Sequence, residues 1–214
     1  MSSSHSPIPA GVLSATAEVP RLTLRERNKL RVKEDLVDAV INELARSETG
    51  LCVLDDVLRR AGLSKGTFYN HFPGGRDQLL LLAYEQLGRE FRALSERLRN
   101  ERERSQQKVM AFADAYFSIC EMPLNGKLYS VSEPALLPIL APAIGQTSGW
   151  VKEAIKGDLM STSNFQGSGG QVRAEACATL IVGAIREAGR KVHATPILRP
   201  ALSEELLGII EGIM

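Results

Sequence analysis

Apolar residues recur every three or four positions along most of the chain, and this spacing predicts helices. The clearest stripe, between residues 26 and 47, consists of Leu36, Val37, Val40, Ile41 and Leu44. A longer helix is expected from about Arg76, with a charged and solvated end at residues 97–108. No segment alternates apolar and polar residues as a half-buried strand would. We therefore predict an all-α fold of about nine helices.

Prolines and glycines interrupt this spacing between residues 123 and 149. Proline removes a backbone donor and clashes with the preceding turn, so one long helix is not expected there. Short helical pieces at 136–140 and 143–146, followed by a separate helix at 150–160, are predicted instead.

Basic residues are concentrated near the N-terminus, although the net charge is only +1. Between Arg21 and Lys33 there are six bases and one acid, whereas residues 34–214 carry 20 bases and 23 acids. Such a local cluster suits a phosphate footprint, although a solvated helix start would have the same composition. Residues 1–20 are rich in Ser and Pro and are predicted to form a disordered tail.

The segment LCVLDDVLRRAGLSKGTFYNHFPGGRDQL, residues 51–79, has the pattern of a helix-turn-helix. Gly62 can adopt the left-handed conformation of the turn, and Leu63 can plug the turn into the core. Ser64 is a good N-cap for the next helix. The first turn of that helix then exposes Lys65, Gly66 and Thr67, which suit contact with phosphate oxygens.

The second helix of this motif presents two faces. Phe68 and Phe72 are four residues apart and should face the core. Tyr69, Asn70 and His71 lie on other faces and are candidates for contacts with DNA, since Asn can bind adenine through two hydrogen bonds. Tyr69 could instead cap the core, and His71 could be a packing residue.

Residues from about 33 to 83 resemble the DNA-binding domain of the tetracycline-repressor (TetR) family of bacterial regulators. That family has a run similar to Ala-Gly-Val-Ser-x-Gly-x-x-Tyr-x-x-Phe, and this chain has Ala61-Gly62-Leu63-Ser64-Lys65-Gly66-Thr67-Phe68-Tyr69-Asn70-His71-Phe72. The family's phosphate-contacting Lys is matched by Arg76 after one inserted residue. Cys52 and Val53 stand where the family often has Thr.

The resemblance implies a ligand-responsive transcriptional regulator, by family default a repressor, that binds a near-palindromic operator as a homodimer. It implies a DNA-binding domain at residues 21–80 and an effector-binding and dimerisation domain at residues 81–214. The basic arm at residues 21–33 would follow the DNA backbone or enter a minor groove. The expected DNA contacts are Arg25, Lys29, Lys33, Ser64, Lys65, Gly66, Thr67, Tyr69, Asn70, His71 and Arg76.

The second half of the chain is expected to pair subunits and to hold an effector. Residues 172–192 are rich in Ala and Gly, and residues 202–213 are apolar on more than one face. Both helices could be buried within one subunit, but the resemblance favours a homodimer through them. A small, mostly apolar organic effector is expected, in a pocket formed by Phe112, Tyr116, Phe117, Tyr129, Leu137 and Trp150. Plain core packing is the alternative for these side chains.

Other functional classes find little support in the sequence. No hydrolase, phosphate-loop or zinc-protease motif is present, so we do not expect an enzyme. Cys52, Cys120 and Cys177 are far apart, and neither a metal site nor a cofactor is expected. No membrane span or secretory signal is visible, which favours the cytoplasm. The remaining alternative is a helical, dimeric protein-interaction module that does not bind DNA.

Overall fold

Every regular element in the part of the chain that the structure describes is a helix. The computed structural model describes residues 23–46, 53–122, 128–129 and 136–214. The elements are α1 (Leu24–Arg46), α2 (Leu54–Ala61), α3 (Lys65–His71), α4 (Gly75–Asn100), α5 (Ser105–Cys120), α7 (Leu137–Met160), α8 (Gly170–Ala194) and α9 (Arg199–Ile213), with short 3₁₀ turns η1 (Ser163–Phe165) and η2 (Pro196–Leu198). The all-α prediction is confirmed. The predicted tail at residues 1–20, Arg21 and Cys52 lie outside the described residues.

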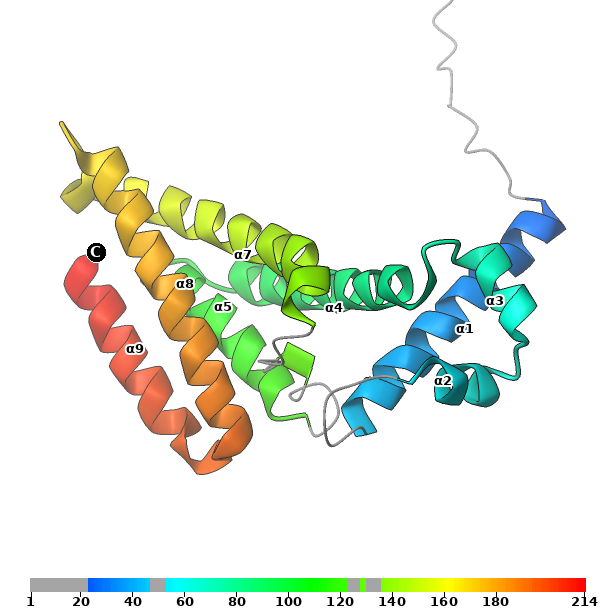
Figure 1. The fold of residues 1–214 in the computed structure, drawn as a ribbon. Coiled ribbons are helices and arrows are strands. Elements are labelled where there is room, and N and C mark those ends of the chain that lie inside the picture. The colour runs from blue at the N-terminus through cyan, green and yellow to red at the C-terminus, as the bar shows by residue number, and fades with distance from the viewer. Residues whose placement is uncertain (1–22, 47–52, 123–127, 130–135) are drawn as a thin grey trace, which may run out of the picture.

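Helices α1, α2 and α3 gather at one end of the molecule, around the start of α4 (Figure 1). The apolar stripe of α1 is buried there, with Leu36 and Val40 fully covered. Val57 of α2 and Phe68 of α3 join the same cluster, and Leu79 and Leu80 of α4 close it. A side-chain ion pair between Arg60 and Glu43, 2.8 Å long, also ties α2 to α1.

Helix α4 runs from this end of the molecule into the other half, where α5, α7, α8 and α9 pack together (Figure 1). Its residues Leu79 to Leu87 belong to the first core cluster, whereas Phe91 belongs to a second cluster built mainly on α5, α7, α8 and α9. A single helix therefore contributes to both cores. Among the described helices, none has both the length and the apolar character of a membrane span.

Helix α7 is one continuous 24-residue helix, and the prediction of separate pieces across this region is wrong. Pro138 lies in the first turn, where a backbone N–H has no partner within the helix, so it costs little there. Pro142 does lie inside the helix. Packing of α7 against α4, α5 and α8 offsets its cost, as shown by the burial of Leu140, Val151 and Ile155.

The charged end of α4 is only partly solvated, contrary to the sequence-based expectation. Arg99 makes two hydrogen bonds to Asp158 of α7, at 2.7 and 3.2 Å, and a third to the carbonyl of Lys108. Its guanidinium carbon also lies 4.6 Å from the centre of the Phe112 ring. The two charged side chains are 18% and 14% exposed. Arg99 therefore fixes the end of α4 to both α5 and α7.

Candidate nucleic-acid interface and ligand cavity

The turn between α2 and α3 has the geometry that the sequence predicts. Gly62 is left-handed, with φ 65° and ψ 30°, and its N–H bonds back to α2. Ser64 caps α3, and its hydroxyl accepts a hydrogen bond from the Thr67 N–H at 3.1 Å. Leu63 packs, partly buried, against the first core cluster. The helix-turn-helix is thus held by a glycine, a cap and an apolar plug.

One face of α3 is core and another is open to solvent. Phe68 and Phe72 are fully buried, with ring centroids 5.4 Å apart. Tyr69 is 50% exposed and leans edge-on against Phe68, while Asn70 is exposed. His71 is half-buried, and its Nδ1 is covered without a hydrogen-bond partner. Tyr69 and Asn70 are therefore available to a partner, whereas His71 also has a packing position.

The basic side chains near α3 have contacts within the protein. Lys65 pairs with Asp55 of α2 at 2.9 Å, and this hydrogen bond raises the pKa of Lys65. The Lys33 ammonium lies 5.9 Å from the centre of the Phe72 ring. Arg76 is half-buried beside Asp77. Lys65 and Asp55 are both exposed, so solvent screens their pair and a phosphate could compete for the lysine.

The first turns of α1 form an exposed basic arm, which we define as Arg25, Arg27, Lys29 and Arg31. These turns project beyond α3 at one end of the molecule (Figure 1). Thr23 and Glu26 hold the start of the arm as a capping box: the Thr23 N–H donates to the Glu26 carboxylate at 2.8 Å, and the Glu26 N–H donates to the Thr23 hydroxyl at 3.3 Å. The bond from the Thr23 N–H lowers the pKa of Glu26. The sequence signal for this box is Thr-x-x-Glu, which the sequence analysis did not use.

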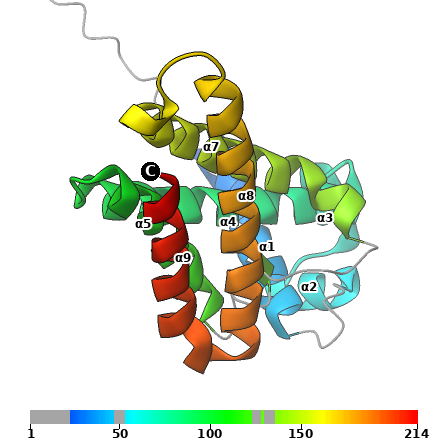
Figure 2. The ribbon, with the colours of Figure 1, turned by 90° about the vertical axis from the view of Figure 1, so that its left-hand side faces the viewer.

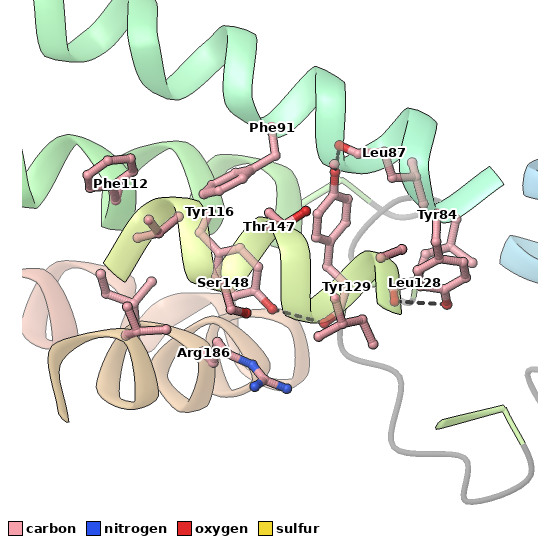
Figure 3. A pocket seen from close by; sticks show the side chains of 16 residues that line it. Tyr84, Leu87, Phe91, Phe112, Tyr116, Leu128, Tyr129, Thr147, Ser148 and Arg186 are labelled. Atoms are coloured by element: carbon pink, nitrogen blue, oxygen red, sulfur yellow. Dashed lines mark hydrogen bonds between the residues drawn. The ribbon is translucent and has the colours of Figure 1, made fainter. Parts of the chain in front are cut away.

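A cavity opens in the other half of the molecule, between α4, α5, α7 and α8. The volume open to the centre of a water-sized molecule is about 100 Å³. Aromatic residues make up much of its wall: Tyr84, Phe91, Phe112, Tyr116 and Tyr129. Polar tips come from Thr147, Ser148 and Arg186 (Figure 3). The mostly apolar lining with a few polar tips suits a small organic molecule.

Solved structures show which known fold the chain has. A TetR-like transcriptional regulator from Rhodococcus sp. RHA1 superposes with a TM-score of 0.63 at 16% identity, covering 89% of this chain and 96% of that one. A TetR-family transcriptional regulator from Streptomyces coelicolor gives 0.60 at 18% identity, covering 86% and 94%. The fatty acid degradation regulator FadR from Bacillus halodurans gives 0.63 at 14% identity, covering 83% and 95%. The chain has the TetR-family fold. At the level of sequence, no protein-family model and no curated protein matches it.

Within this TetR-family fold, the cavity includes half of the side chains predicted to bind a ligand. Phe112, Tyr116 and Tyr129 line it. Phe117 is fully buried in the second core cluster, and Leu137 is 41% exposed at the start of α7. Trp150 lies beside the cavity, with its ring centroid 5.4 Å from that of Phe112. These last three side chains do not line the cavity.

None of the lining residues on α4, α7 and α8 was predicted from the sequence. Tyr84, Leu87 and Gly88 lie on α4, Thr147 and Ser148 on α7, and Arg186 on α8. Gly88 allows close packing, because a Cβ there would lie 2.7 Å from the Thr147 Oγ1. A glycine within an otherwise helical pattern indicates a close approach by another element, but the sequence does not show that Thr147 is the residue that approaches Gly88.

Neither metal nor thiol chemistry gains support from the geometry. No group of three His, Cys, Asp or Glu side chains suitable for a metal occurs among the described residues. Cys120 is buried, which raises the pKa of its thiol to about 12 and keeps it protonated. Cys177 is half-buried on α8.

Proposed function

We propose that this protein is a ligand-responsive, DNA-binding transcriptional regulator that acts as a dimer. The observation that carries the proposal is α3. This helix is capped at Ser64 and anchored through Phe68 and Phe72, and it leaves Tyr69 and Asn70 exposed. The TetR-family fold supports it, since regulators with that fold superpose over more than four-fifths of this chain.

In this proposal α3 enters the major groove of DNA. Asn70 reads a base edge, and Tyr69 contacts a thymine methyl or a phosphate. Lys65 exchanges its partner Asp55 for a phosphate, while Ser64, Gly66 and Thr67 bring the backbone close to the DNA. His71, Lys33 and Arg76 complete the contacts beside them. The basic arm, with Arg25 and Lys29, follows the phosphate backbone and supplies affinity that is independent of sequence.

Two subunits pair through the outer faces of α8 and α9. These helices lie side by side on one side of the molecule, and no other helix of the described residues covers their outer side (Figure 2). On α8 the face opposite the buried residues carries Ala176, Leu180 and Gly183, and Leu180 is 72% exposed. On α9 the corresponding face carries Gly208 and Gly212. Small residues permit close packing of helices, and burial of an exposed leucine between two subunits would stabilise the dimer.

In this proposal residues 21–80 form the DNA-binding domain and residues 81–214 the effector-binding domain. An effector in the cavity acts on DNA binding through α4, which belongs to both. Tyr84, Leu87 and Phe91 of this helix line the cavity, and its first turns pack against α1. Operator half-sites one turn apart require recognition helices about 34–36 Å apart. A ligand that binds more tightly to a different spacing releases the DNA, as expected of a repressor.

Two sets of substitutions separate base recognition from phosphate contact. Asn70→Ala should weaken operator binding about 10- to 100-fold and relax the preference at one base pair, because it removes contacts to a base edge. Arg25→Gln with Lys29→Gln should instead weaken binding to all DNA. That pair should also reduce the slope of log K against log salt by about 2. Fluorescence-anisotropy titrations over a salt series measure both effects.

Arg97→Gln with Arg104→Gln provides the matched control. It removes two exposed charges at the far end of α4 and the start of α5, remote from α1 in Figure 1. Its salt slope should equal that of the native chain. Equal losses from this control and from the arm variant would mean that net charge, rather than the arm, governs binding. If neither variant changed binding to any DNA, the protein-interaction alternative would replace the proposal.

A further inference from the structure

The cavity has an uneven charge distribution. Among the described residues that line it, Arg186 is the only charged one, and none is acidic. Arg186 is exposed, so it stands at the mouth, whereas Phe91, Phe112 and Leu128 deeper in the wall are buried. The space therefore has an apolar interior and a cationic rim.

The hydrogen-bonding groups of the cavity fall into two classes. The three tyrosine hydroxyls are already engaged as donors: Tyr84 to the Leu128 carbonyl at 3.2 Å, Tyr116 to the Tyr129 carbonyl at 2.9 Å, and Tyr129 to the Leu87 carbonyl at 2.5 Å. Thr147, Ser148 and Arg186 make no hydrogen bond or ion pair with any residue that the structure describes. The donors that remain for a ligand are thus two hydroxyls and one guanidinium.

Ser148 and Arg186 lie on the same side of the cavity. Figure 3 shows them together beside the Tyr116 hydroxyl, with Thr147 on the other side of Tyr116. Burial raises the pKa of Tyr116, and the positive charges of Arg186 and Arg190 both oppose this rise. Arg190, one turn further along α8, differs in two ways: it pairs with Glu187, and it is not among the described residues that line the cavity. Of the two arginines, Arg186 lines the cavity and has no acidic partner among the described residues, whereas Arg190 has one.

We propose that the cavity binds an amphipathic carboxylate. Its aromatic or aliphatic body would lie among the aromatic side chains, and its carboxylate would bind Arg186 and Ser148. This inference rests on the proposed function, in which the cavity is the effector site. It adds an acidic head group to the small, mostly apolar organic effector expected from the sequence. A guanidinium and a hydroxyl can donate together to the two oxygens of a carboxylate. A cationic ligand would meet the Arg186 charge, and no described residue of the wall is acidic.

Calorimetric titration of the full chain with pairs of ligands that differ only in their head group tests the inference. The probes are 4-phenylbutyrate against 4-phenylbutanol, and decanoate against decanol. In at least one pair the carboxylate should bind the native chain about tenfold more tightly than the alcohol. Arg186→Gln should reduce this ratio to about one by weakening carboxylate binding alone. Because the alcohol lacks the charge, its affinity serves as the check that the cavity is intact.

Arg190→Gln is the matched control, because it removes the same charge from the same helix outside the cavity, and it should keep the tenfold ratio. Equal binding of both head groups to the native chain would overturn the inference. The inference would also be overturned if Arg186→Gln weakened carboxylate and alcohol binding equally, or if the native chain bound no carboxylate at millimolar concentration. Titration of the native chain with operator DNA separates the two proposals. DNA binding without carboxylate preference refutes only this inference, whereas carboxylate preference without DNA binding refutes only the regulator.

Discussion

Leu180→Glu should convert the protein into a monomer and lower its affinity for operator DNA at least about 100-fold. Leu180 is 72% exposed on the face of α8 that we propose to pair subunits. In the dimer a glutamate there would be desolvated close to its symmetry copy, without a partner charge. A monomer also loses the avidity of two linked recognition helices, which accounts for the size of the DNA effect.

Sedimentation velocity and anisotropy titration measure the two consequences of Leu180→Glu. Ile197→Glu is the matched control, since Ile197 is 85% exposed but lies in η2, between α8 and α9. The control should remain a dimer with native affinity for DNA. If the Leu180 variant remained a dimer at micromolar concentration, the paired surface would have to lie elsewhere.

Gly189→Ala should destabilise the protein by about 1–3 kcal/mol. A Cβ at this position would lie 2.2 Å from Cε1 of Tyr116 and 3.1 Å from the Sγ of Cys120. The Tyr116 ring cannot easily retreat, because it packs edge-on against Phe91 and Tyr129 and its hydroxyl holds the Tyr129 carbonyl. Because Tyr116 lines the cavity, a shift of its ring should also weaken ligand binding.

Thermal unfolding at fixed protein concentration measures the effect of Gly189→Ala. Gly157→Ala is the control, because Gly157 is exposed on α7 and a Cβ there would meet nothing within 4 Å. That control should gain up to about 1 kcal/mol from the better helix propensity of alanine. Tyr116→Leu in the Gly189→Ala background should restore part of the lost stability. A Gly189→Ala protein as stable as the Gly157→Ala control would contradict the close packing of α5 and α8.

The helix-turn-helix could be predicted in detail because its determinants are local. Gly62 and Ser64 act within four residues of their own positions, and Phe68 and Phe72 follow the helical period. The resemblance of residues 61–72 to the TetR family was therefore enough to predict the fold correctly. The capping box at Thr23 was equally local, so the same reasoning could have found it.

The cavity could be predicted only in part, because its wall is assembled from residues far apart in the sequence. Aromatic side chains on α5 were visible as candidates, but the periodicity of Phe112 and Phe117 does not show which of them faces a void. Arg186 lies in an Ala-rich helix with no local signal of a binding site, and only the packing of α8 on α5 and α7 places it at the cavity. The continuity of α7 was missed for a related reason: tertiary packing offsets the local cost of Pro142.

Anisotropy titration of the native chain with the DNA that flanks its own gene shows whether the protein is a DNA-binding regulator. We expect binding that survives scrambled competitor DNA, saturates at two or four chains per site and weakens steeply with salt. Absence of binding to any DNA, even at low salt, would contradict it.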